Sequence, residues 1–302
     1  MTGAQAASGP TLRELLGAST LRLIAASGHA GGRAEDVATA ASDARREAEM
    51  LIGQVLGRER AWCYAHADER LALPAVAQFE QLLARRLSGE PLAYILGRRE
   101  FWSLDLTVTP DVLIPRAETE LLVELALQHI PQGEHVEIVD AGTGSGAIAL
   151  ALARERPQAR VLAIDSSEAA LDVASANARR LDIANVEFAL SDWFAAIGER
   201  RFHLIVANPP YIAEADAHLA AGDLRFEPRA ALASGVHGLD AIRCIVCATP
   251  AHLAAGGWLL FEHGHEQGEA ARALLRENGF VEIFTRRDLE KRERVSGGRV
   301  PN

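Results

Sequence analysis

From residue 118 onward the chain alternates short apolar runs with helical segments, and this alternation constrains the fold more than any other feature. The apolar runs, rich in Val, Ile and Leu, are Val136–Val139, Val161–Ile164, Val186–Leu190, Leu204–Ala207, Trp258–Phe261 and Val281–Phe284. Helical patterns lie between most of them, as in Ala147–Arg156, Glu168–Leu181 and Gly268–Glu277. Buried strands separated by helices predict an α/β fold with a mostly parallel, doubly wound sheet. Such sheets bind ligands beyond the carboxyl ends of their strands, near the point where the strand order reverses.

The N-terminal third has a different pattern. Residues 1–10 are small and polar, and we expect them to be disordered. Apolar residues then recur at helical spacing in three segments: Thr11–Ala26, Asp43–Leu56, for which Ser42 is the expected cap, and Pro74–Leu87. No motif in these segments indicates catalysis.

Between Pro91 and Pro115 the period changes again. Leu104, Leu106 and Val108 alternate with polar residues, which is typical of a β-strand, and we expect a β-hairpin here. The sequence therefore predicts a helical-bundle domain at 1–90, a β-hairpin linker at 91–115 and the α/β domain at 116–302.

Composition limits where the chain works and what it binds. No apolar run approaches the roughly 18 residues of a membrane span, and the N-terminus lacks the pattern of a secretory signal, so we expect a cytoplasmic protein without membrane contact. Residues 1–90 carry 10 basic and 11 acidic residues, and the remainder carries 21 and 30. The acidic α/β part is a poor receptor for the phosphate backbone of DNA.

The cysteine count excludes a disulfide framework, because the chain contains only 3. Cys244 and Cys247 are spaced as in a metal or redox motif, but they lie in an apolar segment at helical spacing without a second ligand pair. We interpret them as reduced thiols of the core.

A glycine-rich loop follows the first strand of the α/β domain, in the stretch EIVDAGTGSGAIALALA. Gly142, Gly144 and Gly146 allow a tight turn and a close approach of the backbone to a ligand, and the next helix offers free N–H groups. Read with Ala147, the loop also fits the dinucleotide pattern G-x-G-x-x-A, and a tight turn without a ligand would use the same glycines.

Two neighbouring features bear on whether the cofactor is NAD or S-adenosylmethionine. Asp165 ends the second strand, where a carboxylate accepts hydrogen bonds from a ribose diol, which both NAD and S-adenosylmethionine present. Asp140 before the loop gives D-x-G-x-G-x-G, a pattern of methyltransferase loops, and Asp192-Trp193 follows the third strand, where an adenine would lie. These features favour S-adenosylmethionine.

The stretch HLIVANPPYI ends the fourth strand with Asn208-Pro209-Pro210-Tyr211. Proline has no N–H and fixes φ, so this loop is stiff and presents carbonyl oxygens, while the residue before proline is held extended. The side-chain oxygen of Asn208 and a proline carbonyl, beside an aromatic ring, suit a planar –NH2 group that donates two hydrogen bonds. Holding both N–H bonds turns the nitrogen lone pair toward a methyl donor and stabilises the positive charge that grows on nitrogen.

N-P-P-Y after D-x-G-x-G-x-G marks methyltransferases that act on amino groups of adenine or glutamine, and nearly the whole chain resembles the HemK/PrmC glutamine methyltransferases, which modify peptide-chain release factors. The resemblance lies in the stretches DVLIPRAETELLV, VDAGTGSGAIALALA, SDWF, ANPPYI, GDLRFEPRAAL, LLFEHGHEQG and RVSGGR. The family usually has R-P-E-T where this chain has Arg116-Ala117-Glu118-Thr119, and often D-L-G-T-G where Ala141 stands here. Both differences fall at scaffold positions.

The resemblance implies a Rossmann-like S-adenosylmethionine-dependent methyltransferase domain that modifies the glutamine of the Gly-Gly-Gln loop of class I release factors. It assigns the cofactor to Gly142, Thr143, Gly144, Ser145, Gly146, Asp165 and Trp193, with Asn208 close to both ligands. It assigns the glutamine amide to Asn208, Pro209, Pro210 and Tyr211 as catalytic residues, and places Phe101 in the lining of the substrate pocket. It assigns no metal.

Three other functions remain open at this point. A glutamine methyltransferase acting on a ribosomal protein would differ only in how it docks its substrate. An adenine methyltransferase would need a basic face or a target-recognition domain, and a binding module without activity would not need both loops intact.

Two charged stretches have simple structural interpretations. We interpret Glu262–Glu266 as a strand end followed by a helix start rather than a metal cluster, and Arg286–Arg294 as a solvated surface segment.

Overall fold

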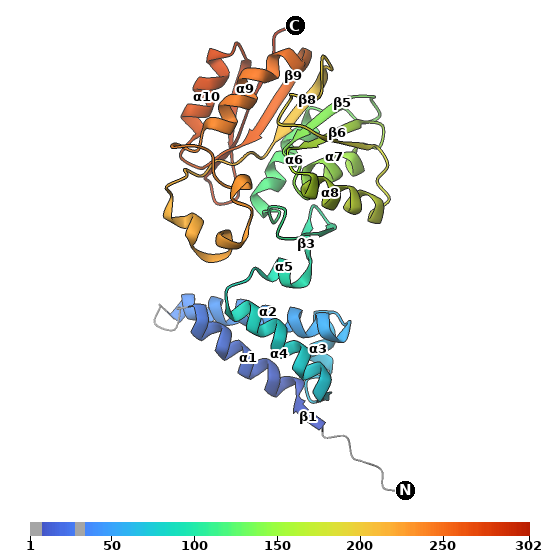
Figure 1. Ribbon diagram of the computed structural model, residues 1–302, viewed down its shortest axis with the longest axis vertical. Coiled ribbons are helices and arrows are strands. Elements are labelled where there is room, and N and C mark those ends of the chain that lie inside the picture. The colour runs from blue at the N-terminus through green and yellow to red at the C-terminus, as the bar shows by residue number, and fades with distance from the viewer. Residues whose placement is uncertain (1–7, 28–33) are drawn as a thin grey trace. The chain divides into compact units, whose positions relative to one another are not determined.

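The computed structural model describes residues 8–27 and 34–302, and the chain divides into two compact units, Met1–Leu96 and Gly97–Asn302 (Figure 1). Most of the segment predicted to be disordered, residues 1–7, lies outside the described residues. For residues 8–10 the prediction is wrong, because they belong to a strand that pairs with residues 70–72.

The first unit is a helical bundle with a short antiparallel strand pair. Its elements are β1 (Ser8–Thr11), α1 (Leu12–Ser27), α2 (Ala34–Leu56), α3 (Arg60–Ala65), β2 (Arg70–Ala72), α4 (Leu73–Leu87) and α5 (Leu92–Leu96). Helices α1, α2 and α4 contact one another and bury a common apolar core that includes Leu16, Ile52 and Phe79. The three helical segments predicted from the sequence correspond to these helices.

The start of α2 differs from the prediction. The helix begins at Ala34 and Ser42 lies inside it, because the alanine-rich segment before Ser42 has high helix propensity. The end is as predicted, at Gly57, whose φ of 62° suits a C-terminal cap. Glu49 of α2 is fully buried and accepts hydrogen bonds from Arg45 and from Arg60 of α3, which ties the two helices together.

The second unit is the doubly wound α/β domain. Before its large sheet lie β3 (Arg98–Phe101), β4 (Leu104–Thr107), the 3-10 turn η2 (Ala117–Thr119) and α6 (Glu120–Gln128). The sheet and its connections are β5 (Glu137–Ala141), α7 (Ala147–Glu155), β6 (Arg160–Asp165), α8 (Glu168–Arg180), β7 (Val186–Leu190), β8 (Phe202–Ala207), η3 (Ala217–Ala220), η4 (Gly222–Phe226), η5 (Arg229–Ala231), α9 (Asp240–His252), β9 (Leu253–Glu262), α10 (Gly268–Glu277), β10 (Val281–Arg287) and β11 (Glu293–Arg299).

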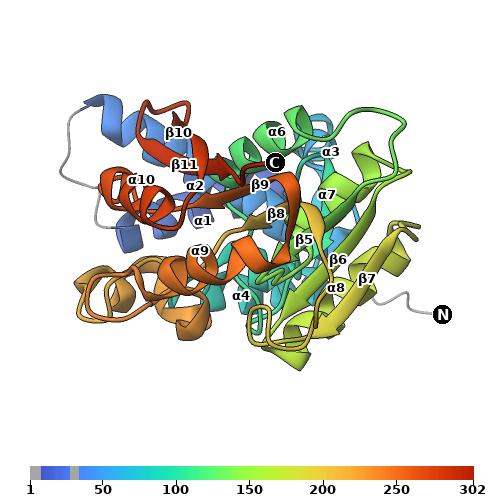
Figure 2. The ribbon, with the colours of Figure 1, turned by 90° about the horizontal axis from the view of Figure 1, so that it is seen from above.

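The strand order of the large sheet is β10-β11-β9-β8-β5-β6-β7, and Figure 2 shows the strands side by side in this order. The five strands β9, β8, β5, β6 and β7 are parallel, and β11 is antiparallel to both of its neighbours. The order reverses between β5 and β8, so the point where such sheets bind ligands lies beyond the carboxyl ends of these two strands.

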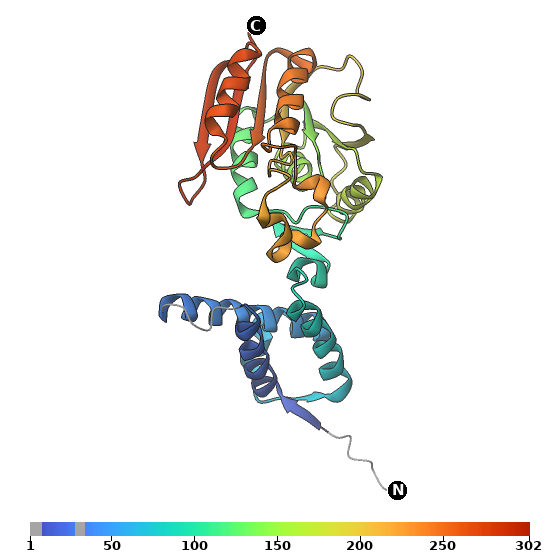
Figure 3. The same ribbon diagram turned by 60° about the vertical axis from the view of Figure 1, so that its left-hand side comes forward.

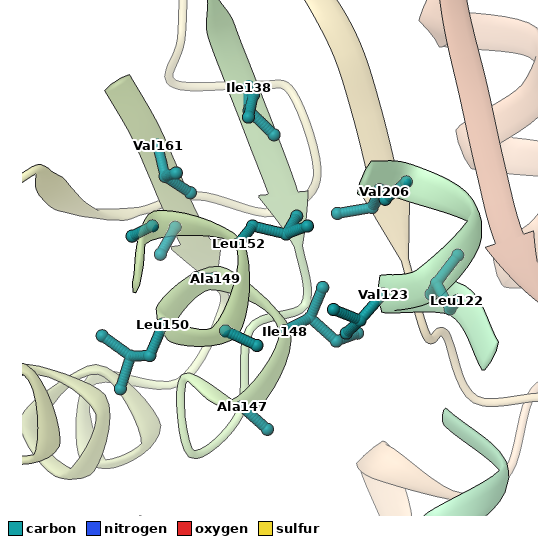
Figure 4. Close-up of a cluster of buried hydrophobic side chains, with 14 of the residues drawn as sticks. Leu122, Val123, Ile138, Ala147, Ile148, Ala149, Leu150, Leu152, Val161 and Val206 are labelled. Atoms are coloured by element: carbon teal, nitrogen blue, oxygen red, sulfur yellow. The ribbon is translucent and has the colours of Figure 1, made fainter. Parts of the chain in front are cut away.

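Alternate strand residues face opposite layers of helices, as the pleat requires. Ile138, Val161 and Val206 pack with α6 and α7 in one core cluster (Figure 4). Their neighbours Val139, Leu162 and Ile205 pack with α9 and α10 in the other. Figure 3 shows α10, in red, against the red strands β10 and β11. Helices therefore cover both faces, which confirms the predicted α/β architecture.

The strand predicted at Val281–Phe284 is present as part of β10, but the prediction missed β11, which follows it. Arg286 and Arg287 belong to β10, and Glu293 and Arg294 begin β11, so this stretch is not simply a surface segment. The Arg294 side chain is only 11% exposed and pairs with the buried carboxylate of Asp288. Two glycines inside β11 mask its strand character in the sequence, because glycine has low strand propensity.

The two cysteines of the C-x-x-C spacing are exposed, and the prediction that they are core thiols is wrong. Helix α9 buries Ile242, Ile245 and Val246, which places Cys244 and Cys247 on its solvent face. No helix within residues 8–27 and 34–302 has the length and apolar character needed to cross a membrane.

Candidate active site

A cavity of about 270 Å³ lies at the carboxyl ends of β5, β6, β7 and β8. It is bounded by the segments that follow these four strands, by residues 111–119 and by residues 228–231. The site is therefore where the sheet topology predicts a ligand.

The glycine-rich loop after β5 forms one wall. Gly142, Gly144 and Gly146 have φ values of 80°, 54° and 85°, a region that favours glycine. The loop is fixed from below, because the N–H groups of Gly142 and Thr143 both donate to the carbonyl of Ile164 at 2.9 Å. The backbone turns required by the sequence pattern are thus present.

Asp140, the residue two positions before Gly142, stabilises the glycine-rich loop through hydrogen bonds. Its carboxylate is fully buried and accepts hydrogen bonds from the Thr143 hydroxyl at 2.7 Å and from the N–H of Ala149, in the first turn of α7, at 3.1 Å. Burial raises the pKa of Asp140 to about 7, since desolvation outweighs these two hydrogen bonds. Ser145 is also buried, and its carbonyl accepts from the Asn177 amide of α8.

Asp165 ends β6 and faces the cavity as predicted. One carboxylate oxygen accepts from the N–H of Gly144 at 2.9 Å and the other from the N–H of Ser167 at 3.0 Å. A carboxylate oxygen can accept about two hydrogen bonds, so each oxygen retains capacity for one hydroxyl of a ribose diol.

The charge of the cavity distinguishes the two cofactors that the sequence pattern allowed. Three carboxylates line it, those of Asp111, Asp165 and Asp192, and none of the residues that line it is Arg, Lys or His. This set would repel the pyrophosphate of NAD and attract the sulfonium cation and ammonium group of S-adenosylmethionine.

Trp193 lies beside the glycine loop, half-buried, with a φ of 47°. The Ser191 hydroxyl donates to the Trp193 carbonyl at 2.5 Å and stabilises this backbone conformation. A Cβ on Gly142 would lie 3.6 Å from the Trp193 ring, so the loop and the ring form one continuous wall. Such an aromatic surface suits a planar base.

Asn208, Pro209 and Pro210 line the cavity at the end of β8, beside the glycine loop. The Asn208 amide donates through Nδ2 to the Thr119 hydroxyl at 3.1 Å. Its Oδ1 atom is buried and has no hydrogen-bond partner among the described residues. A buried acceptor without a partner is costly, and this one is available to a donor that enters the cavity.

Tyr211 is placed differently from its three neighbours, because it does not line this cavity. Its hydroxyl donates to Glu262 at 3.0 Å and its ring packs partly into the second core cluster. Burial and the adjacent Glu262 raise the pKa of the Tyr211 phenol. Its carbonyl accepts from the Gln267 side chain at 3.0 Å, which anchors the proline loop.

Two buried residues behind the loop had no assigned role in the sequence. Thr119 donates through its hydroxyl to Glu262 at 2.7 Å, and Glu262 is 1% exposed. Burial raises the pKa of the Glu262 carboxyl. As predicted, Glu262 ends a strand and a helix follows at Gly268. Thr119 and Glu262 stand in separate stretches that carry the family resemblance, and only the fold brings these two residues together.

A further contact joins two of the segments that line the cavity. Glu227 is buried, accepts from the N–H of Ile114 at 3.0 Å and pairs with Arg116. Residues on both sides of this contact, among them Val112 and Pro228, line the cavity. The pair therefore ties these two parts of the cavity wall together.

Phe101 does not line this cavity, contrary to the expectation for it. Its ring is 1% exposed and belongs to the core cluster of Leu104, Leu106 and Leu122. The hairpin turn at Trp102 and Ser103, both with positive φ, sets the register in which Phe101 pairs with Leu104. In the part of the chain that is described, no group of three or more His, Cys, Asp or Glu side chains could hold a metal ion.

Comparisons with known proteins match both units. Residues 117–236 match the family model of the methyltransferase small domain, and residues 33–97 match that of the PrmC N-terminal domain. The release factor glutamine methyltransferase of Xylella fastidiosa strain Temecula1 is 52% identical over 85% of this chain and 94% of its own length. That of Escherichia coli K12 is 45% identical over 86% and 94%.

A solved structure of a methyltransferase from Pyrococcus furiosus shares the fold, with a TM-score of 0.51 and 16% identity. The match covers 74% of this chain and 100% of the other.

Proposed function

Because this chain belongs to the family of release factor glutamine methyltransferases, we propose that it transfers a methyl group from S-adenosylmethionine to the side-chain amide nitrogen of a glutamine. The target is the glutamine of the Gly-Gly-Gln loop in class I peptide-chain release factors. The observation that carries this proposal is the buried Oδ1 of Asn208, which has no hydrogen-bond partner among the described residues and belongs to a residue that lines the acidic cavity.

The acceptor loop performs the chemistry by holding an amide. Asn208 Oδ1 accepts one N–H of the glutamine side chain, and a carbonyl of the Pro209-Pro210 segment accepts the other. With both N–H bonds held, the amide plane is fixed, so the lone pair of the nitrogen, which is perpendicular to that plane, points toward the methyl donor. The same oxygens stabilise the positive charge that develops on nitrogen, and the proton leaves to water after transfer, so no general base is needed.

The cofactor side of the cavity fits S-adenosylmethionine. When bound, this cofactor supplies an electrophilic methyl group on a sulfonium. Asp165 would accept the ribose hydroxyls, Asp192 and Trp193 would hold the adenine, and the backbone of Gly142, Thr143, Gly144, Ser145 and Gly146 would approach the remainder of the cofactor. The carboxylates that line the site favour the positive charge of the cofactor.

Residues 1–90 supply the specificity. An isolated glutamine side chain is too small to be selected, whereas a specific protein–protein interface buries about 1,600 Å². The helical unit, none of whose described residues lines the cavity, docks a folded region of the release factor, and the glycines beside the target let the loop enter the cavity. The protein acts in the cytoplasm, on a protein substrate and not on DNA.

The docking role is tested with a chain that begins at Gly97. It should retain S-adenosylmethionine binding, which also reports that it is folded, and lose most of its kcat/KM on intact release factor. On a short Gly-Gly-Gln peptide the truncated and full-length chains should be equally slow. Equal activity of both chains on intact release factor would contradict the docking role.

The acceptor is tested by competition. Radiolabelled methyl transfer to purified release factor, ribosomal protein and duplex DNA should favour the release factor. Preferential labelling of a ribosomal protein would mean that the substrate is that protein while the reaction is still glutamine methylation. Preferential labelling of DNA would contradict the proposed function.

A further inference from the structure

Asn208 can perform its role in only one orientation of its side-chain amide, and the residues behind it decide which. With Oδ1 toward the cavity, the side chain accepts a hydrogen bond from an incoming –NH2 group. With the amide reversed, Nδ2 would face that group, and two donors would oppose each other. The two orientations have the same shape, so packing alone does not distinguish them.

Thr119 is the only described residue that the Asn208 side chain contacts by a hydrogen bond, and its hydroxyl has a single proton. That proton is donated to Glu262 Oε2 at 2.7 Å. The Thr119 oxygen can therefore only accept from Asn208, and only the Nδ2 end of the amide can donate to it.

Glu262 fixes the direction of this chain of hydrogen bonds. In its ionised form Glu262 only accepts, and it takes one hydroxyl on each oxygen, Thr119 on Oε2 and Tyr211 on Oε1. Glu262 is 1% exposed and Thr119 is 3% exposed, so water does not replace either partner. Burial raises the pKa of Glu262, while the two hydroxyl donors and the nearby charge of Arg294 on β11 act in the opposite direction and favour the ionised carboxylate.

We propose that Thr119 and Glu262 are positioning residues of the methyl-transfer site, which act through one directed chain of hydrogen bonds to hold the Asn208 amide with its oxygen toward the substrate. This inference rests on the proposed function and explains why the oxygen of the Asn208 amide, rather than its nitrogen, faces the substrate. It also gives Tyr211 a role away from the cavity: its hydroxyl occupies Glu262 Oε1.

Three substitutions test the direction of the chain without a large change in volume. Thr119→Ser keeps the hydroxyl and should retain the single-turnover methyl-transfer rate within about 3-fold. Thr119→Val removes the hydroxyl, so the Asn208 amide no longer prefers the orientation with its oxygen toward the substrate. The methyl-transfer rate should then fall about 10- to 100-fold. Glu262→Gln can donate to Thr119 and so favour the reversed amide, and the rate should fall about 100-fold or more.

Thr249→Val is the matched control. Thr249 is fully buried in α9, its hydroxyl has no partner among the described residues, and it does not line the cavity. This variant should keep the wild-type rate. All variants should bind S-adenosylmethionine with dissociation constants within about 3-fold of wild type, since the cofactor carboxylates are intact.

The inference is overturned if Thr119→Val or Glu262→Gln transfers methyl groups at nearly the wild-type rate, or if Thr119→Ser is as slow as Thr119→Val. A measurement that needs no release factor tests this inference independently of the proposed function. The Asn208 side-chain NH2 resonance, assigned by its loss in Asn208→Asp, should be protected from exchange in wild type and Thr119→Ser and exposed in Thr119→Val. If that pattern holds while wild type fails to methylate release factor, only the proposed function is wrong.

Discussion

Replacing Asp165 by alanine should weaken the binding of S-adenosylmethionine while leaving the fold intact. The Asp165 carboxylate accepts one backbone N–H on each oxygen, from Gly144 and from Ser167, and has capacity left for a ribose hydroxyl on each. The side chain is half-buried at the end of β6, so its removal opens the site to water without emptying the core.

The expected minimum magnitude is that of one lost hydrogen bond between Asp165 and the ribose. A hydrogen bond to a charged group contributes about 1.5–3 kcal/mol. Because about 1.4 kcal/mol corresponds to a tenfold change, the dissociation constant should rise about 10- to 150-fold. Isothermal titration calorimetry on the purified variant measures this directly.

The matched control is Glu187→Ala. Glu187 is an exposed carboxylate on the neighbouring strand β7, paired with Arg200 and not part of the cavity, so its loss should leave cofactor affinity unchanged. Unchanged affinity in Asp165→Ala, or tighter binding of NAD than of S-adenosylmethionine by the wild type, would refute the assignment of this site.

Three further outcomes are expected. Asn208→Ala should lower turnover about 10²- to 10³-fold with a much smaller change in cofactor affinity, and near wild-type turnover at saturating substrate would contradict the acceptor mechanism. Asp140, whose pKa is raised to about 7, favours the folded state most when protonated, so this contribution is full at low pH and is lost as the pH rises toward 7. Between about pH 4 and pH 7 the free energy of unfolding should fall by about 4 kcal/mol from this source. Urea unfolding of Asp140→Asn should not show this fall. If the wild type and Asp140→Asn lost stability equally over this range, Asp140 would not be its origin. Gly146→Ala, at a φ of 85° and with a Cβ 3.1 Å from Ala174, should destabilise the fold by about 1–3 kcal/mol in the same assay. Gly144→Ala, with open space around its Cβ, should cost less, and a larger cost there would contradict the steric reasoning.

The cofactor wall could be predicted from the sequence because its determinants are local. A glycine loop after a strand, an acid at the end of the next strand and two prolines at the end of a third define backbone geometry within a few residues each. The parallel sheet then brings these ends together, as found for Gly142, Asp165 and Asn208. Their roles as ligand-binding groups remain predictions.

The parts that could not be predicted depend on distant contacts or on helix phase. The Thr119–Glu262 hydrogen bond joins residues 143 positions apart, and no local pattern announces it. Tyr211 turns toward that buried pair and Phe101 turns into the core, although both stand beside motifs of the site. Cys244 and Cys247 differ from their apolar neighbours only in their angle around α9, which the local composition did not reveal.

The most direct test of the central claim is to locate the methyl group. Class I release factor, incubated with this protein and S-adenosylmethionine, is digested and its Gly-Gly-Gln peptide is sequenced by tandem mass spectrometry. The account predicts one added methyl group on the side-chain amide nitrogen of that glutamine with the wild type, and a loss of labelling rate of about 10²-fold or more with Asn208→Ala. A methyl group on any other residue, or an unmodified peptide under conditions in which S-adenosylmethionine binds, would contradict it.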